Sequence, residues 1–182
     1  LFNQALGESK IQHDALTQKL TDALVQKRKF NPQIEIKFIT DPINSVYGGV
    51  APDHYRALRQ VGIEVIETDL TPLRASNPLW SGLWYLCCQG IANNPEKGWL
   101  PNPFGEEKIT LRSYLSLFNF KANHRKTMVV DSPEGWKALV TSMNPHDGSS
   151  RHSNVALIVN GHTAIDVLKT EQAVSLMSKG SV

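Results

Sequence analysis

Residues 1–30 show apolar positions at helical spacing, and a strand-like alternation follows them. Leu16, Leu20 and Leu24 recur at this spacing among polar residues, and Asn31-Pro32 ends the predicted helix. Apolar and polar residues then alternate over residues 34–39, as in a half-buried strand. The pattern therefore predicts a helix over residues 1–30 and a strand after it.

A second helix and a second strand come next. We expect Asp53 to cap a helix that contains Leu58 and stops at Gly62. Residues 63–67 alternate again and predict a strand. A strand, a helix and a strand in this order predict parallel pairing in a sheet that is covered by helices.

Residues 72–105 interrupt this pattern. Five prolines break the stretch, and three of the four tryptophans of the chain lie in it. Residues 80–91 could form a short helix with Trp80 and Trp84 on one face. Two interpretations stay open: an insertion that packs on the domain through its aromatic residues, or a patch at the headgroup level of a membrane, where Trp and Tyr are favoured.

Apolar, aromatic and β-branched residues return after this insertion. They favour strands at residues 117–120, 127–130 and 136–141. Residues 154–159 are almost continuously apolar, which is typical of a strand buried on both faces. Thr163-Ala164-Ile165-Asp166 resembles a capping box, and a helix is expected from there to about residue 177.

Together these elements predict an α/β fold, a mixed and mostly parallel β-sheet flanked by helices. A length of 182 residues fits a single domain over residues 1–182, with the Trp- and Pro-rich insertion at about residues 72–105.

Composition narrows the function only a little. Hydrophobic residues make up 41% of the chain and can supply a core, while charged residues make up 20% and give a net charge of +2. This charge does not favour a nucleic-acid partner, although it does not exclude one. Six basic residues nonetheless surround one stretch of the sequence, either as part of a site or as scattered solvated side chains: Lys108, Arg112, Lys121, Arg125, Lys126 and Arg151.

The two cysteines, Cys87 and Cys88, are adjacent. A bridge between neighbours is strained and the pair lacks the spacing of metal ligands, so we expect free, buried thiols. The chain has no secretory apolar segment and no apolar run long enough to span a bilayer.

The chemistry of the chain centres on His124 and Lys126. Side chains two apart on a strand share a face, so these two residues would point the same way and Arg125 would point away. The same rule places Ser142 and Asn144 together if that strand continues. Histidine can act as nucleophile, acid or base near neutral pH, and lysine, serine and asparagine can hold anionic oxygens. These residue types suit a phosphodiester site that requires no metal.

His124-x-Lys126-x4-Asp131 resembles the HKD motif of the phospholipase D superfamily. Thr141-Ser142-Met143-Asn144 resembles the Gly-Ser-x-Asn element of that family, with Thr141 in place of the usual glycine. The run from Thr141 to Leu157 is similar to the bacterial branch of phospholipase D-like and cardiolipin synthase-like proteins. The resemblance covers roughly residues 117–160, and the gap between Asp131 and Ser142 is a few residues longer than the commonest version.

The resemblance implies a role for each motif residue. His124 is the nucleophile that forms a phosphohistidine intermediate, or else the acid that protonates the leaving alkoxide. Lys126, Ser142 and Asn144 bind the phosphoryl oxygens. Asp131 belongs to the motif but orients its neighbours, because an offset of seven residues puts it on the other face of the strand from His124. No cofactor and no metal is implied.

The polar loop after residue 144 is expected to shape the rim of the site. Asn123, His146 and His152 are the candidate rim residues. A metal cluster of His146, Asp147 and His152 is a weaker alternative, because the spacing of these residues is irregular.

The mechanism of the family uses two HKD motifs, since one histidine cannot be nucleophile and acid at the same moment. None of the other five histidines of this chain has a lysine two positions later. The second half must then come from a homodimer or from a missing part of the polypeptide. The chain begins with Leu1 rather than Met, which favours a half-domain that is a piece of a longer protein.

The resemblance implies phosphodiester hydrolysis or phosphatidyl transfer on phospholipids by a bacterial enzyme with peripheral membrane contact. A nuclease built as a dimer of single-HKD chains is one alternative. A non-catalytic half-domain that binds anionic headgroups or a partner is another. The tryptophan-rich insertion favours a lipid substrate over a nucleic acid.

Overall fold

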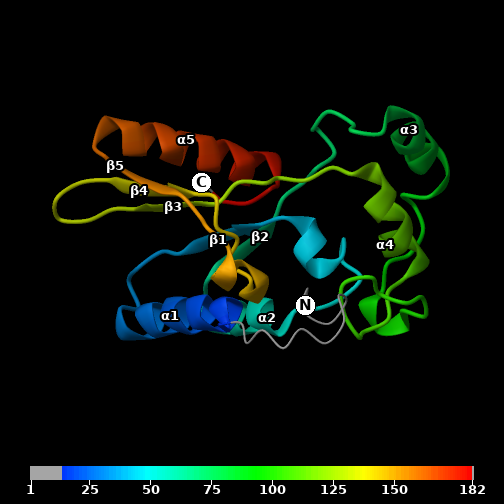
Figure 1. The fold of residues 1–182 in the computed structure, drawn as a ribbon, viewed down its shortest axis with the longest axis horizontal. Coiled ribbons are helices and arrows are strands. Elements are labelled where there is room, and N and C mark those ends of the chain that lie inside the picture. The colour runs from blue at the N-terminus through cyan, green and yellow to red at the C-terminus, as the bar shows by residue number, and fades with distance from the viewer. Residues whose placement is uncertain (1–13, 182) are drawn as a thin grey trace.

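The computed structural model describes residues 14–181, so most of the first half of the helix predicted for residues 1–30 lies outside it (Figure 1). The elements, in chain order, are α1 (Leu16–Phe30), β1 (Lys37–Thr40), η1 (Pro42–Ser45), α2 (Asp53–Gln60), β2 (Glu64–Glu67), α3 (Pro78–Cys87), η2 (Pro95–Lys97), α4 (Leu111–Ser116), η3 (Leu117–Asn119), β3 (Thr127–Val130), β4 (Lys137–Thr141), η4 (Asp147–Arg151), β5 (Ala156–Asn160) and α5 (His162–Met177). The fold is a mixed α/β fold with two small sheets.

The first sheet is the parallel pair that the sequence predicts. β1 and β2 pair from Lys37 opposite Glu64 to Thr40 opposite Glu67, and α2 connects them. Tyr55 and Leu58 of α2 are each 1% exposed and form part of the core beneath this sheet. The prediction that Asp53 caps α2 is wrong: Pro52 occupies the cap position, and Asp53 is the first helical residue. Its carboxylate pairs with Arg56 and lies at the positive end of the helix dipole.

The second sheet is antiparallel, so the prediction of a mostly parallel sheet is not confirmed. Its order is β3-β4-β5, and both pairs are antiparallel. A turn closed by the Gly135 amide and the Ser132 carbonyl (2.8 Å) joins β3 to β4. Such a short link can only connect antiparallel neighbours, because a parallel crossover needs a dozen or more residues. α5 packs across this sheet (Figure 1).

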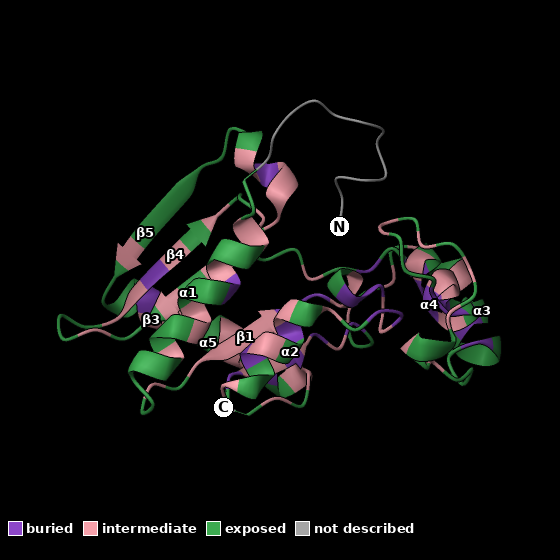
Figure 2. Cartoon of the chain, turned by 90° about the horizontal axis from the view of Figure 1, so that it is seen from below, coloured by how far each residue is buried: buried purple, intermediate pink, exposed green. Residues whose placement is uncertain are grey.

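β5 is an exposed edge strand rather than the buried strand that its apolar run predicts. Val155, Leu157 and Ile158 are 77%, 63% and 67% exposed. β4 is the only strand that pairs with β5 among the described residues (Figure 2). A continuous apolar run is buried only where other elements cover both of its faces, and here α5 covers part of one.

The start of α5 differs from the predicted capping box. The helix begins at His162, and Gly161 occupies the cap position with a φ of 61° and no side-chain hydrogen bond. Glycine adopts this left-handed conformation without steric cost, so the turn itself starts the helix. None of the described helices has both the length and the apolar character needed to cross a membrane.

Residues 72–119 form an insertion lobe that contains α3 and α4 and stands apart from both sheets (Figures 1 and 2). Trp84 is 8% exposed, and the Trp80 indole nitrogen donates to the Leu115 carbonyl at 3.2 Å. The Trp80 ring meets the Phe118 ring edge-on at 5.5 Å. Trp80 therefore packs inside the lobe itself, and Trp84 is buried. Packing of the insertion on the rest of the domain through these two rings stays a prediction.

The strand predicted at residues 117–120 is wrong, because this segment continues α4 as a 3-10 turn and ends at Phe120 with a left-handed φ of 51°. Thr110 caps α4, since its side chain accepts the Ser113 amide at 3.1 Å. Because the helix that begins after this cap continues into residues 117–119, these residues adopt helical geometry despite their preference for strands.

The prediction of free thiols is also wrong, because Cys87 and Cys88 form a disulfide. Cys87 is the last residue of α3 and is exposed, whereas Cys88 is 9% exposed and has left helical geometry, with φ −125° and ψ −19°. The bond therefore forms where the backbone is no longer held by a continuing helix.

Candidate functional site

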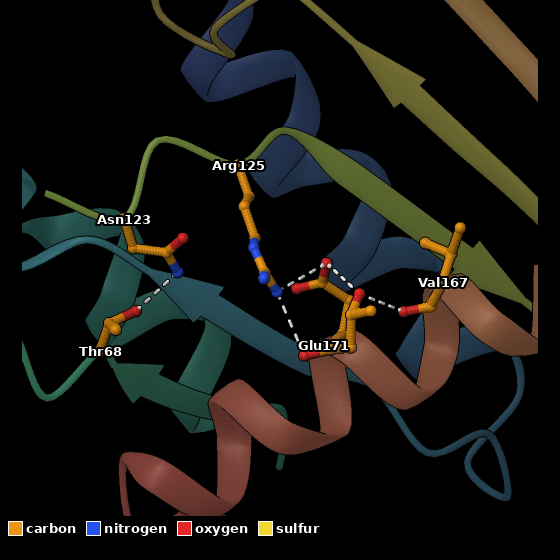
Figure 3. Close-up of polar contacts among 6 residues, drawn as sticks. Thr68, Asn123, Arg125, Val167 and Glu171 are labelled. Atoms are coloured by element: carbon orange, nitrogen blue, oxygen red, sulfur yellow. Dashed lines mark hydrogen bonds and ion pairs between the residues drawn. The ribbon is translucent and has the colours of Figure 1, made fainter. Parts of the chain in front are cut away.

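The carboxyl ends of β1 and β2 anchor the segment that leads to His124. The Asp41 carboxylate, just after β1, accepts the backbone N–H of Asn123. The Asn123 side-chain amide donates to the Thr68 hydroxyl, just after β2, at 3.2 Å (Figure 3). The Tyr47 hydroxyl donates to the Lys121 carbonyl at 3.0 Å. The crevice beyond the carboxyl ends of parallel strands is a common ligand site, and this segment lies at that edge.

His124 and Lys126 precede β3, so the prediction that they lie on a strand is wrong by a few residues. The Lys126 carbonyl still accepts the Thr141 amide at 2.9 Å, which adds one rung beyond the regular ladder. His124 is exposed, and the Lys126 ammonium donates to the His124 carbonyl at 3.1 Å. Burial lowers the pKa of Lys126 below its usual value. The exposed His124 side chain and the partly desolvated Lys126 ammonium are thus two residues apart in the segment that precedes β3.

Arg125 between them is directed to α5. Its guanidinium donates to the Thr170 carbonyl at 3.2 Å and lies 3.6 Å from a Glu171 carboxylate oxygen (Figure 3). The guanidinium is therefore committed to α5, and Lys126 is the nearest cation in sequence left for the site.

Ser142 and Asn144 follow β4, whose end lies beside the start of β3. The Ser142 hydroxyl accepts the Val155 amide at 3.0 Å and donates to the Asn154 side chain at 3.3 Å. Asn144 is half-buried in the next loop. Within the described residues, neither side chain is hydrogen-bonded to His124 or Lys126. The fold brings the four residues to one end of the β3–β4 pair but does not lock them together.

Asp131 lies at the opposite end of β3 and is exposed. Seven residues of extended chain separate it from His124, which corresponds to about 20 Å. It therefore shares no site with His124 within this chain, and the orienting role expected for it stays a prediction.

The candidate rim residues His146 and His152 flank η4. The His146 imidazole lies 3.4 Å from the Ser149 hydroxyl, and the His152 amide donates to the Ser149 carbonyl at 3.2 Å. In residues 14–181, no three His, Cys, Asp or Glu side chains gather in a way that could hold a metal ion, so His146, Asp147 and His152 do not form such a group.

Sequence reasoning missed two residues of this region, Asp41 and Tyr47. Burial raises the pKa of Asp41, while hydrogen bonds from the Ile43 and Asn123 amides and the nearby His124 oppose that rise. Burial and the charge of Asp41 raise the pKa of Tyr47 to about 12. The position of Asp41 directly after a predicted parallel strand was the available signal, because such positions meet at one edge of the sheet.

Two hollows lie near this edge. The smaller, of about 360 Å³, lies between the ends of the parallel strands and the insertion lobe; its lining includes Thr68, Asp69, Tyr85, Arg112 and Lys121. The larger, of about 640 Å³, opens beside α2. Neither is lined by His124 or Lys126. His124 and Lys126 thus lie outside both hollows, although Lys121, three residues before His124, lines the smaller one.

Comparisons with known proteins assign no family to the chain. A scan against protein-family models finds no match, and searches of curated proteins and of solved structures find none either. A functional proposal therefore depends on the motif residues and on their placement in the fold.

Proposed function

We propose that this chain supplies one half-site of a phospholipase D-like enzyme that hydrolyses phospholipid phosphodiesters or transfers their phosphatidyl group. One observation carries the proposal. The hydrogen bond from the Thr141 amide to the Lys126 carbonyl (2.9 Å) aligns the start of β3 with the end of β4. The two motif elements, His124 with Lys126 and Ser142 with Asn144, therefore share one end of this strand pair although they are far apart in sequence.

The proposed chemistry follows from these groups. An imidazole nitrogen of His124 attacks phosphorus, and the bond from phosphorus to the ester oxygen breaks as the bond to nitrogen forms. Lys126 balances the charge on the non-bridging oxygens. The leaving alkoxide takes a proton from the histidine of a second half-site. Water or an alcohol then displaces His124 from phosphorus and gives its own proton to that second histidine.

A lipid substrate is favoured by the surface of α3. Leu79, Leu83 and Leu86 are 88%, 50% and 89% exposed, and the helix contains no charged residue. An apolar helix face of this kind suits the boundary between headgroups and acyl chains of a membrane. The membrane patch is therefore proposed for these leucines in place of Trp80 and Trp84, which face into the lobe.

A non-catalytic half-domain that binds anionic headgroups is the second candidate. Two contacts favour it: the Ser142 hydroxyl is used within its own loop, and the Lys126 ammonium turns to the His124 carbonyl. In this arrangement the polar groups need to reorient before they can all contact one phosphate.

The test is a phosphodiesterase assay on fluorescent phospholipid vesicles and on bis-p-nitrophenyl phosphate over a range of protein concentrations. If a second copy of the chain supplies the other half-site, we expect activity that rises more steeply than the protein concentration and that falls to background in His124→Ala. If another part of the polypeptide supplies it, the chain alone is inactive and the same comparison is made after that part is added. His162→Ala, which changes another exposed histidine, is the matched control and should keep full activity. Wild-type turnover in His124→Ala with an unchanged circular dichroism spectrum would remove His124 from the mechanism.

A further inference from the structure

Lys121 is a buried lysine with no ion pair among the described residues. It is 7% exposed, and none of the described salt bridges includes it. Its ammonium lies 3.4 Å from the Leu70 carbonyl, 3.3 Å from the Thr71 carbonyl and 3.3 Å from the Tyr85 hydroxyl. It also lies 5.7 Å from the centre of the Tyr85 ring. Charged N–H···O bonds are usually about 2.7–2.9 Å long. The three contacts of the Lys121 ammonium are longer than this, and all three are with neutral groups.

A buried charge without a counter-ion is costly. Asp69 lines the same hollow and interacts electrostatically with Lys121, but none of the described salt bridges joins the two. Hydrogen bonds from Thr71 are the main cause of the lowered pKa of Asp69, and the charge of Lys121 contributes least. The ammonium lines the smaller hollow, which is open to solvent rather than sealed. An anion that enters the hollow would supply the missing opposite charge.

Arg112 makes the same hollow a site with two cations. Its Nε donates to the Gln89 carbonyl at 3.1 Å, which holds the guanidinium plane and leaves its terminal nitrogens for a ligand. The amides of Asn93 and Asn119 also line the hollow, but they already donate to the Tyr47 carbonyl (2.8 Å) and the Ser116 carbonyl (3.3 Å) respectively. Lys121 and Arg112 are therefore the groups that would select the ligand.

The acids of the hollow are held by partners of their own. Glu67 accepts the Ser45 hydroxyl at 2.8 Å, and Asp69 accepts the Thr71 amide at 2.8 Å. Glu67 is the last residue of β2 and Asp69 follows that strand, whereas Arg112 comes from the lobe and Lys121 from the segment after it. An anion with a neutral hydroxylated part would therefore meet cations on one side and hydrogen-bond acceptors on the other.

We propose that this hollow binds the anionic group, a phosphate or a carboxylate, of a small polar molecule, with Lys121 as its counter-ion and Arg112 as the second cation. The volume of about 360 Å³ is in the range of small-molecule sites. If the proposed function holds, the hollow also says something about the substrate of His124. Lys121 precedes His124 by three residues, so their Cα atoms are at most about 11 Å apart. The polar part of the substrate therefore carries an acidic group in addition to the phosphodiester that His124 attacks.

The first experiment measures binding without catalysis. Calorimetric titration of the chain with glycerol 3-phosphate, with inorganic phosphate and with uncharged glycerol should give binding of the two anions only. Lys121→Met keeps the length of the side chain and removes the charge, so it should weaken binding about tenfold or more. Lys108→Met, at an exposed lysine of the same lobe, should bind as the wild type does. Equal binding by Lys121→Met and wild type, or no binding of either anion by the wild type, would overturn the proposal.

Folding of the variant is checked independently. Methionine in place of a buried, unpaired lysine is expected to keep or raise the melting temperature. Arg112→Met provides a second variant at a side chain that is not buried, and it too should weaken anion binding. If Lys121→Met does not fold, unchanged anion binding in Arg112→Met would overturn the two-cation site.

The second experiment tests whether the anion belongs to a lipid headgroup or is a free molecule. It also distinguishes a failure of the anion site from a failure of the proposed function. Vesicles of phosphatidylserine and of phosphatidylcholine, offered to the chain with its second half-site, should show a preference for the serine headgroup that Lys121→Met abolishes. Lys121-dependent anion binding without any phosphodiesterase activity would retain the hollow as a site for a free anion and overturn the proposed function. Activity that is equal on both lipids, without anion binding, would retain the proposed function and overturn the hollow.

Discussion

Replacing the exposed leucines of α3 by glutamine should weaken membrane binding. Leu79, Leu83 and Leu86 are 88%, 50% and 89% exposed, so together they offer the surface of about two whole leucine side chains. Full burial of that surface is worth about 3–6 kcal/mol. Immersion to the headgroup boundary buries about half of it, which leaves about 2 kcal/mol and predicts a loss of roughly 30-fold in vesicle partitioning.

The assay is sedimentation of sucrose-loaded vesicles over a range of lipid concentrations, with the triple variant Leu79→Gln, Leu83→Gln, Leu86→Gln beside the wild type. Leu176→Gln is the control, because Leu176 of α5 is 57% exposed on another part of the molecule. All three proteins should have the same circular dichroism spectrum, since the changed side chains lie on the surface. A triple variant that partitions like the wild type would show that α3 does not contact the membrane.

Two further predictions concern stability. Trp84→Ala should lower the free energy of unfolding by about 3–5 kcal/mol in urea titrations, because it empties a site that is 8% exposed; a loss below 1 kcal/mol would contradict the role of Trp84 in the lobe. Burial raises the pKa of Asp41 in the folded state above its ordinary value of 3.8. Asp41 therefore adds to the free energy of unfolding below pH 3.8, and this added stability is lost as the pH rises through the higher pKa of the folded state. Asp41→Asn should remove this part of the pH dependence, and identical pH profiles of variant and wild type would refute the assignment.

The parallel pair of strands could be predicted from the sequence, but the direction of the other strands could not be read from alternation. The order β1, α2, β2 follows from periodicity, and the helix supplies the crossover that parallel strands need. For β3 and β4 the alternating pattern gives no direction. The short turn at residues 132–135 does, because it cannot carry a parallel crossover.

Burial was harder to predict than secondary structure. The run at residues 154–159 has the composition of a buried strand, yet β5 is exposed because no second strand pairs with it among the described residues. Residues 117–120 have strand propensity, yet the cap at Thr110 places them in the continuation of α4. Both failures come from neighbours in space or upstream in the chain, which local composition does not reveal.

The candidate site could be predicted in part. Spacing by two residues suggested the grouping of His124 with Lys126 and of Ser142 with Asn144, and the rung between Lys126 and Thr141 places the two pairs at one end of the strands. The contact of Asp41 with Asn123 joins residues that are 82 positions apart, and no local sequence pattern predicts it. The burial of Lys121 likewise depends on Leu70, Thr71 and Tyr85, which belong to distant segments.

The attachment of α1 to the loop around η4 has a consequence for the order of events during synthesis. The Thr17 amide donates to Asp147 at 3.3 Å, and its hydroxyl donates to the Pro145 carbonyl at 2.9 Å, across 130 and 128 residues respectively. Ribosomes add about 5–20 residues per second, so α1 waits on the order of ten seconds for its partners to emerge. The closing of so long a loop also makes this contact slow to form. The rim beside Asn144 therefore takes its final shape late in folding, and α1 remains available to chaperones until then.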